Sequence, residues 1–186
     1  QTVTCTLPAG VGELVSISLV SGVLFSQSKY LLTYAAPSIT KVTGCANSGS
    51  TTTNCPRTGG TKITLEGSDF GASLSVVFVG TALCGNVVHD GSSPHSKLTC
   101  DTASGVKTSR PVIMIQEGGR VSSVNGVLSY AQCPAGKRQA NDTDYACTIC
   151  PVGTYTGSEG LTECQPCDNG YFSNTTGLTA CARCDE

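Results

Sequence analysis

Tryptophan is absent from the 186 residues, aromatic residues make up only 5%, and the four charged residue types together make up 13%. The low charge and the 39% hydrophobic content exclude a disordered chain. A net charge of −2 provides no excess of basic residues to bind phosphates, which argues against a nucleic-acid-binding protein. No apolar run approaches the roughly 20 residues of a membrane-spanning helix. Helix formers are few and β-branched residues are many, which predicts an all-β fold of short strands and turns.

Cysteine, by contrast, is plentiful, and its distribution divides the chain. Five of the 12 cysteines lie in residues 1–132 and seven crowd into residues 133–186. Charge changes at the same place, from eight basic and six acidic residues before it to three basic and seven acidic residues after it. The second part is too short to bury enough surface unaided, so it needs cross-links. We expect a boundary at 131–133 and an extracellular location.

Two internal repeats organise the chain. The tail repeats every 17 residues, with three Cys-x-x-Cys pairs in phase: Cys147 and Cys150, Cys164 and Cys167, Cys181 and Cys184. A longer repeat relates the segment from Val3-Thr-Cys5 to Tyr34 to the segment from Leu98-Thr-Cys100 to Tyr130. Residues 1–36 are therefore predicted to be the second half of a domain whose complete copy spans residues 37–132, and we expect the chain to be a segment of a longer polypeptide.

Alternation of apolar and polar residues predicts seven short strands in the complete copy, near residues 38–43, 61–66, 74–79, 86–89, 97–100, 111–116 and 127–130. Gly67-Ser-Asp-Phe-Gly71 breaks the pattern, and Phe70 is expected to plug one end of the core. Strands of this number and spacing are typical of an immunoglobulin-like β-sandwich.

Several motifs carry a resemblance to known families. Pro37-Ser-Ile-Thr40, Gly59-Gly-Thr-Lys-Ile-Thr64 and Gly67-Ser-Asp-Phe-Gly71 resemble the IPT/TIG domain, and the match covers 37–132. The tail, with Cys150-Pro-Val-Gly-Thr-Tyr155 and its Cys-x-x-Cys rhythm, resembles the ephrin-receptor-like cysteine-rich repeats, which are relatives of EGF-like modules. The tandem combination resembles large cell-surface proteins of algae and protists, including mastigoneme-type proteins of flagella.

The resemblance also implies a disulfide pattern. Each tail cysteine after a Pro-Gly turn pairs across its own loop in the resembled repeats, and nearest partners pair in the sandwich. The implied bonds are Cys45–Cys55, Cys84–Cys100, Cys133–Cys147, Cys150–Cys164 and Cys167–Cys181. Cys5 and Cys184 are left unpaired within the segment. Zinc binding is the competing interpretation of Cys-x-x-Cys, but the third in-phase pair and the glycosylation motifs in the repeats favour disulfides.

Other candidate sites are few. His89 and His95 lie near one turn with only Asp90 as a nearby acid, so they are expected to be loop residues rather than metal ligands. Asn141-Asp-Thr-Asp144 lacks the ligand spacing of an EF-hand, and a solvated turn is favoured over calcium. Gly59-Gly60 precedes a strand and is no phosphate loop. We predict no catalytic residue, no metal and no cofactor.

Asn141 and Asn174 each begin an Asn-x-Thr motif on a polar turn, which predicts N-glycosylation. The tail tyrosines Tyr145, Tyr155 and Tyr171 are candidate contact residues, although stacking on their own disulfide loops is the favoured interpretation.

Three functions remain open. The favoured one is a structural segment of a large extracellular protein that assembles with copies of itself, or with other extracellular structural proteins, into a filament or surface appendage. The second is the ectodomain of an adhesion or signalling receptor, and the third is an accessory module of a secreted enzyme. The favoured function implies a cell-surface location, on a flagellum if the mastigoneme resemblance holds. It implies covalent glycans, but no nucleic-acid partner and no membrane insertion of this segment.

Overall fold

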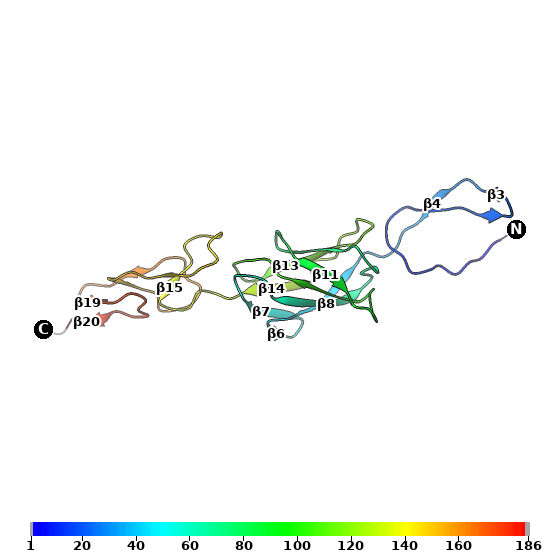
Figure 1. Cartoon of the computed structure of the whole chain (residues 1–186). Coiled ribbons are helices and arrows are strands. Elements are labelled where there is room, and N and C mark those ends of the chain that lie inside the picture. Colours follow the sequence, from blue (N-terminus) through cyan, green and yellow to red (C-terminus); the bar gives the residue numbers. More distant parts are fainter. Residues whose placement is uncertain (1, 185–186) are drawn as a thin grey trace.

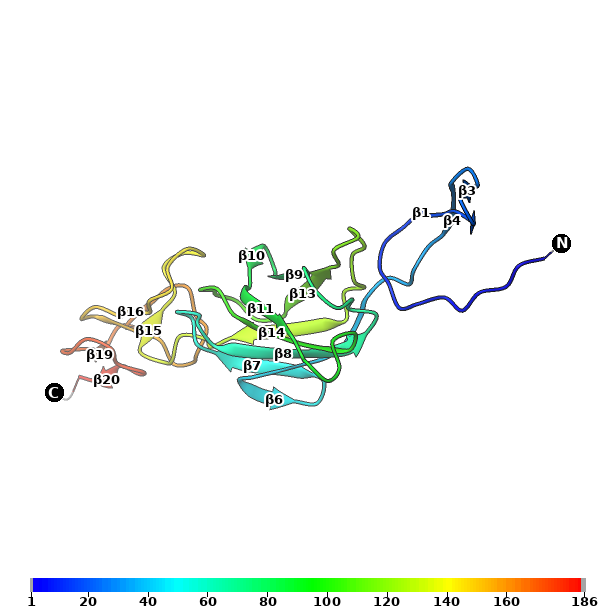
Figure 2. The same cartoon turned by 45° about the vertical axis from the view of Figure 1, so that its right-hand side comes forward.

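A computed structural model describes residues 2–184 of the chain. Three parts follow one another along an elongated molecule: an N-terminal hairpin segment, a central sandwich and a cysteine-rich part (Figure 1). The same order is kept when the molecule is turned by 45° (Figure 2). β3 (Leu24–Phe25) of the N-terminal segment and β20 (Ala182–Arg183) of the cysteine-rich part lie toward opposite ends of the molecule, with the sandwich between them (Figure 1).

The central sandwich contains ten strands. Their bounds are β5 (Ser38–Thr43), β6 (Ala46–Ser48), β7 (Thr51–Cys55), β8 (Lys62–Ser68), β9 (Val76–Val79), β10 (Ala82–Leu83), β11 (Gly85–His89), β12 (Lys97–Asp101), β13 (Arg110–Ile115) and β14 (Gly126–Tyr130). One sheet has the order β10-β9-β13-β14-β7-β6 and the other has the order β11-β12-β8-β5. Neighbouring strands are antiparallel, except that β14 and β7 run parallel.

The core lies between the two sheets and follows from the alternation of the strands. Ile63 and Leu65 on β8 and Val112 and Met114 on β13 belong to one core cluster, and all four side chains are fully buried. Phe70 is also fully buried, as expected for a plug at one end of the core. A Cβ on Gly67 would overlap the carbonyl oxygen of Ser38, so this position near the end of β8 requires glycine.

The all-β, immunoglobulin-like fold is confirmed, and each of the seven predicted strands is present with ends shifted by a few residues. Three strands, β6, β7 and β10, were not predicted. The stretch around β7 is rich in Ser and Thr and has no apolar alternation. Thr52 is nevertheless fully buried, because its hydroxyl accepts a hydrogen bond of 2.9 Å from the backbone N–H of Cys45.

The N-terminal segment forms two small antiparallel pairs. β1 (Val15–Ile17) pairs with β4 (Lys29–Leu32), and β2 (Val20–Ser21) pairs with β3 (Leu24–Phe25). Residues 2–14 form no strand. This segment has few buried side chains, in contrast to the sandwich that follows it.

The cysteine-rich part consists of three two-stranded units spaced by 17 residues. They are β15 (Lys137–Arg138) with β16 (Thr148–Ile149), β17 (Thr154–Tyr155) with β18 (Gln165–Pro166), and β19 (Tyr171–Phe172) with β20 (Ala182–Arg183). The bonds between units recur with the same period. Gly136 N–H donates to Thr156 O, and 17 residues later Gly153 N–H donates to Ser173 O. The units therefore stack as a ladder in which each one contacts its neighbours.

Candidate functional site at the joints between modules

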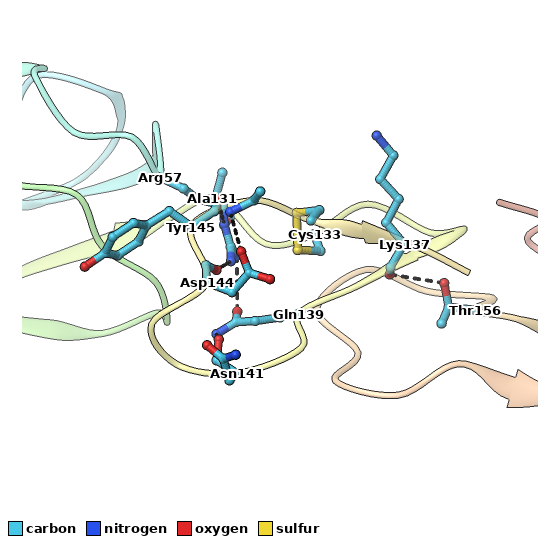
Figure 3. The surroundings of a disulfide bond; sticks show 11 residues. Arg57, Ala131, Cys133, Lys137, Gln139, Asn141, Asp144, Tyr145 and Thr156 are labelled. Carbon is cyan, nitrogen blue, oxygen red and sulfur yellow. Dashed lines mark hydrogen bonds between the residues drawn. A yellow bond between two sulfur atoms is a disulfide. The ribbon is translucent and has the colours of Figure 1, made fainter. Parts of the chain in front are cut away.

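Arg57 lies where the sandwich meets the cysteine-rich part. It follows β7 by two residues, in a turn that Gly59 N–H closes on Pro56 O at 3.1 Å. Its side chain extends toward the loop that Cys133 anchors (Figure 3). Only 8% of Arg57 is exposed, which is rare for a charged residue without a charged partner.

The guanidinium group of Arg57 donates hydrogen bonds to four oxygen atoms beyond the sandwich core. Nε donates to Tyr145 O at 3.0 Å and Nη2 donates to Asp144 O at 2.8 Å. Nη1 donates to Gln139 Oε1 at 3.1 Å and to Ala131 O at 3.4 Å. All four acceptors are uncharged, so hydrogen bonds rather than a carboxylate satisfy this buried cation. The planar group thereby fixes the loop relative to the sandwich.

A second contact across this joint joins Lys107 to Asp142 as an ion pair. Both side chains are more than half exposed, so the pair contributes little stability and mainly biases the orientation. Two hollows of about 230 and 340 Å³ flank the joint, and Lys107 and Asp142 line both of them. Their walls come from the two modules, so their shape depends on the contact that Arg57 holds.

The opposite end of the sandwich makes a joint with the N-terminal segment. A Cβ on Gly118 would overlap the backbone of Gly12, and a Cβ on Gly71 would stand 2.8 Å from Val11 Cγ1. Glu13 and Arg120 form an ion pair beside this contact. Glycine is needed at residue 118 because its backbone lies against the backbone of Gly12.

Equivalent loops of the two copies of the longer repeat form the two joints. Tyr34 N–H donates to Gly12 O at 3.0 Å, and Tyr130 N–H donates to Lys107 O at 3.1 Å. Gly12 and Lys107 therefore hold equivalent positions in the longer repeat. The loop at Gly12 contacts the sandwich, and the loop at Lys107 contacts the cysteine-rich part.

Comparison with protein families identifies the central module. The family model described as the IPT/TIG domain matches residues 37–130, which include all ten strands of the sandwich. The chain belongs to the IPT/TIG domain family. No curated protein matches the chain. The TIG domain is an immunoglobulin-like module, and beside a disulfide-rich region it fits an extracellular multi-domain protein.

The structure joins ten of the cysteines in five bonds: Cys45–Cys55, Cys84–Cys100, Cys133–Cys147, Cys150–Cys164 and Cys167–Cys181. The first two lie in the TIG domain, where Cys84 and Cys100 are buried. Cys5 and Cys184 are exposed and have no partner within residues 2–184. In the same range, no helix is long and apolar enough to cross a bilayer.

Of the two histidines expected in a loop, His95 lies in one and His89 does not. His89 is half-buried on β11 of the TIG domain, whereas His95 is exposed. The His89 ring bonds Pro94 O through Nδ1 at 2.8 Å and Ser75 Oγ through Nε2 at 3.0 Å. Because Pro94 O only accepts, Nδ1 carries a proton, and His89 fastens the turn to the sandwich. Within the described residues no three His, Cys, Asp or Glu side chains gather as metal ligands.

The side chains of Asn141, Asp142 and Asp144 in the polar turn each bond to a different group. Asn141 Oδ1 accepts hydrogen bonds from the Thr143 backbone N–H at 3.0 Å and from its hydroxyl at 2.8 Å. Asp144 Oδ1 accepts a bond of 3.1 Å from Ala146 N–H, and Asp142 pairs with Lys107. These oxygen atoms do not converge on a calcium site. Asn141 is exposed, and so is Asn174 in a later unit.

The tail tyrosines are not fully packed. Tyr145 is 45% exposed and Tyr171 is 49% exposed, while Tyr155 is half-buried. The Tyr145 ring lines the smaller hollow at the joint, beside Tyr130 and Arg110 of the TIG domain.

Two groups of the TIG domain have shifted pKa values. The hydrogen bond of 2.8 Å from Asn86 Nδ2, with Lys62 nearby, lowers the pKa of the Asp101 carboxyl. Burial raises the pKa of the Tyr130 hydroxyl, and Arg110 partly offsets that effect. The Tyr130 hydroxyl donates to Ala103 O at 2.9 Å, so the neutral phenol is the form that fits the fold.

Sequence reasoning did not identify Arg57. It is a single basic residue after Cys55-Pro56, and its four acceptors come from residues 131–145. Three of those acceptors are backbone carbonyl oxygens, which any residue type supplies. No sequence pattern therefore marks the contact in advance.

Proposed function

We propose that the chain is a structural segment of a large extracellular protein that builds a filament or surface appendage of the mastigoneme kind. In this proposal, residues 1–36 are the second half of a TIG domain that precedes the complete domain at 37–132. Residues 133–186 are ephrin-receptor-like, EGF-related repeats. The segment acts as a spacer that transmits force along its length.

The observation that carries the proposal is the Arg57 contact. A buried cation with three acceptors on the adjoining module, and a fourth on Ala131 just before it, favours one orientation between the TIG domain and the first cysteine-rich unit. Beyond that joint, one disulfide closes each unit, and recurring backbone hydrogen bonds tie each unit to the next. Modules linked in this way suit a stiff rod better than a flexible tether.

The proposed partners are other copies of the protein or other extracellular structural proteins, together with N-linked glycans at Asn141 and Asn174. Both asparagines are exposed, so an oligosaccharide at either position would remain in water. Mass spectra of the native protein that show both asparagines unmodified would remove the glycan part of the proposal.

Electron microscopy of native material extracted without reduction tests the function. Regular filaments with a repeating subunit, labelled by an antibody to the TIG domain, are the expected result. Isolated rods anchored in membrane fragments would support a receptor ectodomain instead. Co-purification with a catalytic domain on the same polypeptide would support an accessory module of a secreted enzyme.

A further inference from the structure

Arg110, the first residue of β13, is a half-buried cation without a polar partner in the described chain. Among residues 2–184 no carboxylate forms an ion pair with it. In the same range the guanidinium groups of Arg57, Arg120 and Arg138 donate hydrogen bonds, but that of Arg110 does not. Buried polar groups in proteins usually have a hydrogen-bond partner, so the donors of Arg110 are available to a ligand.

The turn between β9 and β10 makes room for this side chain. A Cβ on Gly80 would overlap Nη2, Cζ and Nε of Arg110, so the planar guanidinium group lies against the backbone at this glycine. The turn is tied to β13 as well, because Gly80 N–H donates to Pro111 O at 2.7 Å. Packing on the turn therefore positions the guanidinium group before any ligand arrives.

Arg110 forms part of the wall of the smaller hollow at the joint, which has a volume of about 230 Å³. Thr81, Lys107, Tyr130 and Tyr145 contribute to the same wall. Arg110 lowers the pKa of the Tyr130 hydroxyl and Tyr145 raises it, so these three side chains lie close together. The hollow is smaller than the roughly 300–1,000 Å³ of typical small-molecule sites, and it therefore suits one small group.

The charges in the wall leave one cation uncompensated. Lys107 and Asp142 both line the hollow, and they form an ion pair with each other. Arg110 is the remaining charged side chain of the wall. A guanidinium group binds a planar carboxylate through two parallel N–H···O bonds, which a lysine ammonium group cannot do. The wall therefore favours a ligand group with a single carboxylate.

Tyr145 supplies an apolar surface in the same hollow. Its side chain is 45% exposed and points toward the TIG domain (Figure 3). Its backbone oxygen accepts the hydrogen bond from Arg57 Nε at 3.0 Å, which fixes the residue at the joint. A rigid aromatic ring offers contact area at low cost in conformational entropy. The C–H face of a sugar ring packs on such a surface, so a sugar that carries a carboxylate uses both the ring and the cation.

We propose that this hollow binds a hexuronic acid unit of an acidic polysaccharide, with its carboxylate on the Arg110 guanidinium group and its ring face on Tyr145. Because both modules build the wall, the ligand binds only the assembled joint and stabilises it by mass action. The site would attach the segment to a surrounding polysaccharide matrix. This proposal does not depend on filament formation, and either can fail without the other.

The test uses the full chain, 1–186, produced in a bacterial periplasm, where disulfides form. No N-linked glycan is added to Asn141 there, so the only sugar present is the probe. Glucuronate is the probe, and glucose and acetate are matched ligands that lack the carboxylate or the ring. Amide NMR signals of Thr81 and Lys107 should shift and saturate with glucuronate. Glucuronate should bind at least about tenfold more tightly than glucose or acetate, because charged hydrogen bonds are the strong ones.

Three variants separate the contributions to binding. Arg110→Gln should weaken glucuronate binding about tenfold or more, whereas Arg183→Gln, on the exposed β20, should leave it unchanged. Tyr145→Ala should weaken glucuronate binding severalfold and leave acetate binding unchanged, since the backbone bond at this residue remains. Asp142→Asn should tighten glucuronate binding, because Lys107 loses its ion-pair partner and becomes available to the carboxylate.

The outcomes that would overturn the proposal are distinct. Unchanged glucuronate binding in a folded Arg110→Gln chain would remove the role of the cation. Glucose or acetate binding as tightly as glucuronate would show that the site does not recognise an acidic sugar. If Arg110→Gln does not fold, the other two variants decide, because Asp142 and Tyr145 are exposed. Unchanged affinity in both of them would overturn the proposal, and filaments seen by microscopy would stand in either case.

Discussion

The Nε atom of Arg57 lies 3.0 Å from the carbonyl oxygen of Tyr145, a residue 88 positions later in the chain. This bond crosses from the TIG domain to the first disulfide loop of the cysteine-rich part. Its acceptor is a backbone atom, so the contact recognises the shape of the loop rather than the tyrosine side chain. One buried side chain thus makes the main polar contact that orients the two modules, beside the exposed Lys107–Asp142 pair.

Replacing Arg57 by alanine should loosen this joint. The change leaves four oxygen atoms without their donor, at a cost of about 1–3 kcal/mol in the stability of the contact. Small-angle X-ray scattering should show a broader distribution of interatomic distances. Arg57→Lys should recover only part of the effect, because the ammonium group cannot reproduce the planar fork. Arg183→Ala, on the exposed β20, is the control, and equal scattering from all variants would contradict the assigned role.

The stacking of the cysteine-rich units should depend on Gly136 more than on Gly153. Both have φ of +81°, so alanine strains the backbone equally at the two positions. A Cβ on Gly136 would overlap Gly177 O, whereas a Cβ on Gly153 meets nothing within 4 Å. Amide hydrogen exchange near Gly177 should therefore rise in Gly136→Ala. This variant should also lose about 1–3 kcal/mol more unfolding free energy than Gly153→Ala. Similar exchange in the two variants would show that strain alone matters.

Tyr130→Phe should destabilise the TIG domain by about 1 kcal/mol, because Ala103 O loses its donor. Urea unfolding with the disulfides intact measures this change. The pKa of Tyr130 is raised in the folded state, so its contribution is complete below about pH 10 and is lost as pH rises through the raised pKa. The difference between the wild type and Tyr130→Phe should shrink accordingly in alkali. A constant difference across this range would contradict the burial of an ionisable phenol.

Graded reduction should open the cysteine-rich part before the TIG domain. Each of its three loops joins cysteines 14 residues apart, and each bond contributes about 3 kcal/mol by the loop-closure model. Cys164 and Cys181 are partly exposed, whereas Cys84 and Cys100 are buried. Timed alkylation with peptide mapping should show the Cys84–Cys100 bond surviving longest. Earlier loss of that bond, or a map that joins Cys147 to Cys150, would contradict the structure.

Much of the TIG fold could be predicted because its signals are local. The alternation in Lys62–Ser68 and Arg110–Ile115 reflects one buried face per strand, and turn glycines mark where strands end. β6 and β7 escaped prediction because Ser and Thr carry no apolar alternation. The burial of Thr52 depends on a hydrogen bond from Cys45 that only the folded chain supplies.

The all-β class follows from composition, and the period of 17 and the equivalence of Tyr34 with Tyr130 follow from residue types at fixed spacing, so all three can be read from the amino acids. That Arg57 joins two modules and that His89 fastens a turn emerges only in the folded chain. The same is true of the exposure of Ile17 and the burial of Val112. These features depend on which backbone oxygens and strands come within reach, and that depends on the packing of distant segments.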